Sequence, residues 1–266
     1  MSKSISGKTA IITGGANGIG LAIGRHFADQ GANVMFADMD EEQLIKEFGE
    51  TNEGDPIRYF AGDLREKLTI ANLLSATIDA FDQVDILVNA ARQVMPSDPL
   101  NPDDDAVTTL INQNLMPALR LSQLVAKRMI KQAEGREDGM AGSIVNLSSV
   151  ASKLCHPELM AFSMASAALD QMTRSLAVAL ASDKIRVNAV AFGSVMSASL
   201  KGALKEHRDY RAEIEAHTPL GRIASSSELA EAAQFLASDA SGFMTGQIMT
   251  IDGGRSLLDP VNVAAH

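Results

Sequence analysis

The stretch Thr13-Gly14-Gly15-Ala16-Asn17-Gly18-Ile19-Gly20 decides how this chain of 266 residues is interpreted. It directly follows a short apolar run and precedes an amphipathic segment at 18–30. Glycines in such a turn allow a tight bend, a close approach of the backbone to a ligand, and close packing of a helix on a strand. A helix that starts here offers free N–H groups and the positive end of its dipole to a pyrophosphate. The residues expected to cradle a dinucleotide are therefore Gly14, Asn17, Gly18, Ile19 and Gly20.

Outward from this turn, the chain alternates short apolar runs with longer amphipathic segments. Runs rich in Val, Ile and Leu, without strict alternation, are typical of strands buried on both faces. The expected strands are Thr9–Thr13, Asn33–Ala37, Ile57–Phe60, Val84–Val88, Ser143–Leu147, Ile185–Val190 and Gln247–Ile251. The expected helices cover 18–30, 40–49, 66–81, 103–133, 159–181 and 226–238.

This alternation predicts an α/β fold, because strand–helix–strand units form parallel sheets with right-handed crossovers. We expect one Rossmann-type, doubly wound domain over residues 1–266, with about seven parallel strands and helices on both faces. The segment 194–220 has no strand character and carries mixed charge. We therefore expect a helical lid there.

Composition narrows the classes of protein further. The net charge of −10 argues against nonspecific nucleic-acid binding, which depends on Lys and Arg. No uninterrupted apolar stretch reaches the ~18 residues of a membrane span, and the start of the chain lacks the apolar core of a signal peptide. The single Cys155 excludes an internal disulfide and suits a reducing compartment, so a cytoplasmic location is expected. No grouping of His, Cys and Asp has metal-ligand spacing, and no metal site is predicted.

Asp38 ends the second predicted strand, 18 residues after Gly20. An acid at this place can accept hydrogen bonds from the hydroxyls of an adenosine ribose. Its charge would also repel a 2′-phosphate, so the sequence predicts NAD in preference to NADP. The alternative is that Asp38 caps the helix that begins near Glu41 and Glu42.

Several segments together resemble the short-chain dehydrogenase/reductase family. The glycine turn matches the family signature TGxxxGxG, Asp85–Asn89 resembles its fourth-strand motif, and Gly142–Ser149 matches the strand that delivers an active-site serine. Similar segments extend over residues 7–254. The resemblance implies an oxidoreductase fold and a homodimer or homotetramer that pairs through the helices at 103–133 and 159–181.

The resemblance also implies roles for individual residues. Asp63 and Leu64 fall where the family contacts the adenine, and Asn89 falls beside the cofactor. Asn114 takes the place of a helix asparagine that organises a proton-relay water, and Ser149 takes that of the active-site serine.

The sequence departs from the family at its two central chemical positions. Family members use a tyrosine to donate or take the hydroxyl proton and a lysine four residues later to lower the pKa of that tyrosine, because an unperturbed phenol is a poor base at neutral pH. Aligned on Ser149, these positions hold Phe162 and Ser166. The only tyrosines, Tyr59 and Tyr210, have no lysine four residues later, so the motif is not displaced elsewhere.

Three other residues are candidates for the substrate pocket. Arg92 stands where the family has a glycine near the nicotinamide; it suits a ligand carboxylate or phosphate, or else pairs with Asp98 or faces solvent. His156 and Tyr210 are candidates for a replacement proton donor. Their alternatives are a surface loop histidine beside Pro157 and an amphipathic lid residue.

Three functions follow from these observations. The first is a divergent NAD-dependent oxidoreductase that uses another proton donor or relies on Ser149 and water. The second is a nucleotide-binding protein without redox turnover, either a sensor or the inactive subunit beside an active homologue. The third is a non-redox enzyme, such as a lyase or a dehalogenase-like relative, that reuses the pocket. The local chemistry favours inactivity toward ordinary alcohols and ketones.

Overall fold

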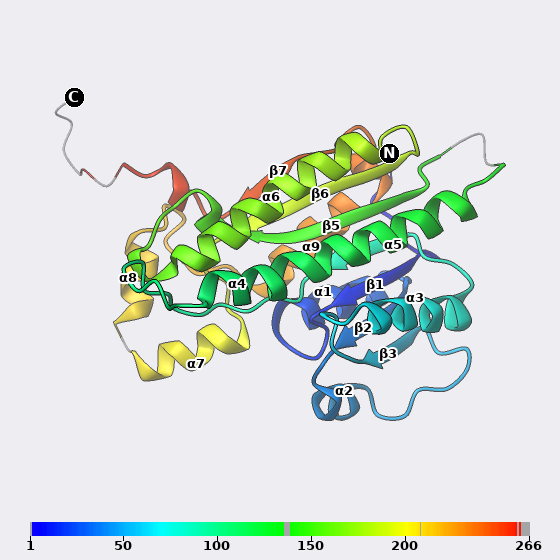
Figure 1. Cartoon of the computed structure of the whole chain (residues 1–266), viewed down its shortest axis with the longest axis horizontal. Coiled ribbons are helices and arrows are strands. Elements are labelled where there is room, and N and C mark those ends of the chain that lie inside the picture. Colours follow the sequence, from blue (N-terminus) through cyan, green and yellow to red (C-terminus); the bar gives the residue numbers. More distant parts are fainter. Residues whose placement is uncertain (1, 136–138, 208, 260, 262–266) are drawn as a thin grey trace.

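A parallel sheet of seven strands, in the order β3-β2-β1-β4-β5-β6-β7, runs through the structure (Figure 1). The structure is a computed structural model, and it describes residues 2–135, 139–207, 209–259 and 261. The strands are β1 (Thr9–Thr13), β2 (Asn33–Asp38), β3 (Ile57–Ala61), β4 (Ile86–Asn89), β5 (Gly142–Ser149), β6 (Ile185–Phe192) and β7 (Ile248–Ile251). Every neighbouring pair is parallel. The predicted doubly wound α/β fold is confirmed, and the order of the strands reverses between β1 and β4.

Helices cover both faces of the sheet. They are α1 (Gly18–Asp29), α2 (Glu41–Phe48), α3 (Lys67–Phe81), α4 (Ala106–Leu110), α5 (Met116–Gln132), α6 (Met160–Leu180), α7 (Ala198–Glu206), α8 (Tyr210–Ala216) and α9 (Ser226–Ala237). One apolar core joins α1 and α9 to the first face, and a second core joins α3, α5 and α6 to the other. Both cores use the Val, Ile and Leu residues that alternate between the two faces of each strand.

The strands β5 and β6 are the longest of the sheet. All eight residues of β5 and all eight of β6 are buried. Their last residues, Ser149 and Phe192, are register partners at the carboxyl edge of the sheet. This edge is where ligands bind in open α/β sheets, beside the point at which the strand order reverses.

The structure departs from the sequence prediction in one long helix. The continuous helix expected over 103–133 begins at Ala106, and a π-helical turn over Ile111–Leu115 interrupts it between α4 and α5. Asn114 lies in this turn, and its side chain folds back onto the backbone of Gln93. Such single π turns are frequent at functional sites.

The segment at 194–220 contains α7 and α8, and its role as a lid stays a prediction. Both helices lie at one end of the molecule, in yellow in Figure 1. Within the described ranges, no helix combines the length and apolar character that a membrane crossing needs. The same ranges contain no group of three or more His, Cys, Asp or Glu side chains placed to hold a metal ion.

Candidate active site

The glycine turn brings the start of α1 to the carboxyl edge of the sheet. Gly14 and Gly18 have φ angles of +67° and +58°, which favour glycine. A Cβ on Gly14 would lie 2.8 Å from the Cα of Ala91, and one on Gly20 would overlap the carbonyl oxygen of Gly14. Asn17 precedes the helix, and its side chain makes no capping hydrogen bond to the first turn. The turn is therefore tightly packed against the backbone after β4. Asn17 leaves the N–H groups at the start of α1 available to an anion.

Asp38 ties the end of β2 to this turn. One carboxylate oxygen accepts a hydrogen bond from the backbone N–H of Ala16 at 3.0 Å, and the other accepts from the N–H of Asp40 at 3.1 Å. The cap of α2 is Asp40, which accepts from the N–H of Gln43 at 3.0 Å. Asp38 is therefore not the helix cap. A carboxylate accepts about four hydrogen bonds, so Asp38 keeps capacity for a ligand hydroxyl.

Arg65 engages the carboxylate of Asp63, a feature that the sequence interpretation missed. The Nη2 atom of Arg65 lies 2.6 Å from one oxygen of Asp63, and Nε lies 2.9 Å from both. These bonds hold the pKa of Asp63 below its usual range. Leu64 points into the core instead and is buried. The sequence signal for this two-pronged ion pair is a basic residue two positions after an acid.

Asn89 belongs to a buried polar chain that joins two strands and two helices. Its Nδ2 donates to Ser122 Oγ at 3.0 Å and to Asn146 Oδ1 at 2.8 Å. Asn146 in turn donates to Thr173 Oγ1 at 2.8 Å. The chain fixes the end of β4 and the middle of β5 against α5 and α6.

Asn114 and Gln93 form a clasp on the other side of the pocket. The Asn114 amide accepts from the N–H of Gln93 and donates to its C=O, both at 2.8 Å. The side chain is buried, and it fixes the loop that follows β4. We expect this clasp to set the path of the chain through Arg92.

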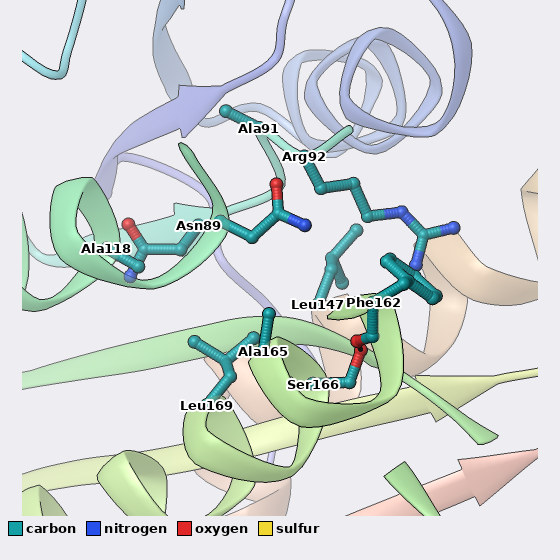
Figure 2. Close-up of a pocket in the computed structure, with 10 residues that line it drawn as sticks. Asn89, Ala91, Arg92, Ala118, Leu147, Phe162, Ala165, Ser166 and Leu169 are labelled. Carbon is teal, nitrogen blue, oxygen red and sulfur yellow. Dashed lines mark hydrogen bonds between the residues drawn. The ribbon is translucent and has the colours of Figure 1, made fainter. Parts of the chain in front are cut away.

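Phe162 and Ser166 lie one helical turn apart on α6 and face the pocket (Figure 2). The Ser166 hydroxyl donates to the carbonyl oxygen of Phe162 at 2.8 Å. The Phe162 ring is buried among apolar residues that include Leu110. A cavity of about 20 Å³, room for about one water molecule, lies beside them. The residues that line it are Asn89, Ala91, Arg92, Asn114, Ala118, Leu147, Phe162, Ala165, Ser166 and Leu169.

Ser149 lies at the end of β5, outside the lining of this cavity. Its hydroxyl oxygen accepts from the N–H of Ala151 at 3.2 Å. That bond leaves its proton free to be donated, but a serine hydroxyl is a far weaker acid than a phenol whose pKa a lysine lowers.

Arg92 extends from the end of β4 across the ends of β5 and β6. Its guanidinium carbon lies 4.1 Å from the centre of the Phe192 ring and 5.8 Å from that of Phe162, and Figure 2 shows it beside Phe162. One N–H donates to the carbonyl oxygen of Ser148 at 3.4 Å. Burial of the head lowers the pKa of Arg92 to about 10, so the side chain is charged at neutral pH. Arg92 therefore stacks on aromatic rings and does not pair with Asp98.

His156 and Tyr210 lie away from the cavity. His156 is exposed, and its Nδ1 accepts from the N–H of Glu158 at 3.3 Å in a short helical turn. Tyr210 begins α8, is 45% exposed and stacks on His207 with ring centres 4.3 Å apart. The structure brings together Asn89, Asn114, Arg92, Phe162 and Ser166, but it does not bring these two residues to them.

Comparison with known proteins gives consistent matches over almost the whole chain. Residues 14–256 match the family model described as enoyl-(acyl carrier protein) reductase. The cis-4-hydroxycyclohexanecarboxylate dehydrogenase of Sinomonas cyclohexanicum is 32% identical, over 96% of this chain and 98% of that protein. The 3-oxoacyl-[acyl-carrier-protein] reductase of Chlamydia trachomatis is 30% identical, over 96% and 100%. The crystal structure of a gluconate 5-dehydrogenase from Burkholderia cenocepacia, in complex with NADP and tartrate, superposes with a TM-score of 0.84 at 29% identity, over 97% and 98%.

Proposed function

Because the chain belongs to the short-chain dehydrogenase/reductase family, we propose that it binds a nicotinamide dinucleotide at the carboxyl edge of its sheet and does not turn over ordinary alcohols and ketones. The observation that carries this proposal is the pair Phe162 and Ser166, at the places of the proton-donor tyrosine and its lysine. A bound nicotinamide ring would supply or accept the hydride. The chain's own residues would have to move the hydroxyl proton.

Phe162, Ser166 and Asn114, which line the cavity, cannot move that proton at a useful rate. Phe162 has no exchangeable proton on its side chain, and the Ser166 proton is already donated to the Phe162 carbonyl oxygen. Asn114 is engaged by Gln93 on both sides of its amide. A positioned general acid typically contributes about 10²–10⁴-fold to a rate, so its loss leaves at most a small residual activity.

The residues at the carboxyl ends of β1 and β2 fit the adenosine and diphosphate of a dinucleotide. Asn17 makes no capping hydrogen bond at the start of α1, and Asp38 stands beside the glycine turn with unused acceptor capacity. Gly14, Asn17, Gly18, Ile19 and Gly20 would hold the diphosphate. Asp38 would hold the ribose hydroxyls, and Asp63 would reach the adenine only while it shares its oxygens with Arg65.

The direct test combines a binding measurement with a turnover measurement. The purified chain is expected to bind NADH, seen as a change in NADH fluorescence, and to show no NAD-dependent oxidation across a panel of secondary alcohols and no reduction of the matching ketones. Brisk turnover of any of them would overturn the proposal. Product formation without added dinucleotide would point instead to the non-redox alternative.

The charge of Asp38 leads us to propose NAD as the preferred cofactor. We expect Asp38→Asn to lower the preference for NADH over NADPH by about tenfold, because it removes one negative charge near the 2′-position. The measurement is the ratio of the two Kd values. Asp40→Asn is the matched control: it removes a nearby charge and keeps the cap of α2, and should change the ratio far less. Wild-type protein that prefers NADPH would contradict the assignment.

A second candidate role is that of a non-catalytic subunit. The helices α5 and α6 share a small apolar cluster made of Ala118, Leu169 and Met172. On α6, the apolar side chains of Met164 and Val178 are exposed, at 48% and 82%. We propose that these helices pair with a second copy of the chain or with an active relative. Co-expression with a competent homologue, followed by size-exclusion chromatography, would distinguish the two.

A further inference from the structure

Arg92 places a positive charge over the carboxyl ends of β5 and β6. The backbone leaves β4 at Ala90 and Ala91, whose N–H groups both donate to the hydroxyl of Thr13 at 3.0 Å. Ala91 also lies directly against Gly14 of the glycine turn. The root of Arg92 is therefore fixed beside the expected diphosphate site, and its side chain points away from Asp38 toward β5 and β6.

The position of this charge relative to a dinucleotide follows from the sheet. The adenosine half belongs to the side of β2, where Asp38 lies, so the other half extends over the ends of β4, β5 and β6. Arg92 spans these three ends, because it starts after β4, donates to Ser148 on β5 and stacks on Phe192 of β6. The nicotinamide half and the guanidinium therefore share one region.

The structure offers nothing in the described residues that neutralises this charge. Arg92 has a single long hydrogen bond, to a neutral carbonyl oxygen, and contacts with two aromatic rings. No carboxylate in the described part of the chain lies within ion-pair distance of it, and burial alone accounts for its altered pKa. The other polar side chains that line the cavity, those of Asn89, Asn114 and Ser166, are uncharged.

The two redox forms of the cofactor differ in this half of the molecule. The ring of NAD⁺ carries a positive charge and the ring of NADH carries none, while their adenosine and diphosphate groups are the same. Two positive charges several ångströms apart in a partly desolvated site repel each other, and water screens that repulsion only in part. Arg92 therefore opposes the oxidised form alone.

We propose that Arg92 makes this site selective for the reduced dinucleotide over the oxidised one. The inference rests on the proposed dinucleotide binding and assigns to Arg92 a role in specificity. In a chain without a proton donor, such selectivity gives a protein whose occupancy follows the ratio of NADH to NAD⁺.

The test measures the Kd of NADH, NAD⁺, ADP-ribose and ADP by calorimetry for the wild type, Arg92→Met and Arg92→Lys. The informative quantity is the change of the Kd(NAD⁺)/Kd(NADH) ratio between the wild type and each variant. Arg92→Met removes the charge and keeps much of the bulk, and is expected to lower this ratio about tenfold. Arg92→Lys keeps the charge and should keep the ratio. ADP-ribose lacks the nicotinamide ring, so its Kd should change little in either variant.

The outcomes separate the inference from the proposed function. An unchanged ratio in Arg92→Met, with ADP-ribose still bound, overturns the role of Arg92 and leaves dinucleotide binding intact. A ratio that falls equally in Arg92→Lys shows an effect of shape and also overturns it. If the wild type binds none of the four ligands, the proposed function itself is overturned. Thermal unfolding of each variant, and Arg92→Gln as a second neutral replacement, guard against a folding defect.

Discussion

The double variant Phe162→Tyr/Ser166→Lys is expected to gain NAD-dependent alcohol oxidation, at a rate about 10²–10⁴-fold above the residual activity of the wild type. The two positions face the same cavity from one side of α6, and Asn114 and Ser149 are already in the chain. The added phenol supplies the missing acid, and the added lysine lowers the pKa of that phenol toward neutrality. Initial rates with a panel of secondary alcohols measure the gain.

The single variants are the controls for this experiment. Phe162→Tyr alone supplies a phenol without a lysine, and Ser166→Lys alone supplies no acid, so each is expected to give a much smaller gain. Arg92 and the introduced lysine would both be positive, and the gain should therefore be larger with Arg92→Gly added. Silence of the triple variant, with NADH still bound, would contradict the view that the missing acid is what prevents turnover.

Gly20→Ala is expected to weaken NADH binding by more than about 100-fold, because the new Cβ would overlap the carbonyl oxygen of Gly14. The overlap is with backbone, so the turn itself must shift, and with it the N–H groups at the start of α1. Calorimetric titration with NADH measures the loss. Circular dichroism checks that the sheet and helices remain folded.

Gly202→Ala is the matched control for this glycine. Gly202 is exposed in α7, and a Cβ there would meet nothing within 4 Å. It should leave the Kd for NADH unchanged and stabilise the helix by roughly 0.5–1 kcal/mol. Equal Kd values for Gly20→Ala and Gly202→Ala would show that the glycine turn does not hold the ligand.

The fold was accessible from the sequence because its signals are local and repeated. The Val/Ile-rich runs predicted the strands, and the glycine turn identified the junction of β1 and α1. The predictions were wrong only at the ends of strands and helices and at one interruption of a helix. The strand predicted at Val84–Val88 is observed at Ile86–Asn89, and the π turn at Ile111–Leu115 was not foreseen. A side chain that bonds to a distant loop, as Asn114 does to Gln93, leaves no trace in periodicity.

The chemistry of the candidate site could be predicted only in part from the sequence. The absence of a tyrosine at 162 and a lysine at 166 is a property of the sequence, and it needed no coordinates. The surroundings of Arg92 did need them, because Phe162 and Phe192 are far apart in the chain and meet only in the folded sheet. The same holds for the polar chain from Ser122 through Asn89 and Asn146 to Thr173.

The hydrogen bond from Ser166 to the Phe162 carbonyl has a consequence for the energetics of the pocket. A buried lysine and a phenol that has to ionise are costly to desolvate, which is one source of the trade-off between activity and stability. Here the serine satisfies its own hydroxyl within the helix, and the phenylalanine adds to the apolar core. These two positions therefore add no uncompensated polar group to the core. At these two positions the chain has released that conflict, whereas the buried charge of Arg92 in the same pocket still carries a cost of desolvation.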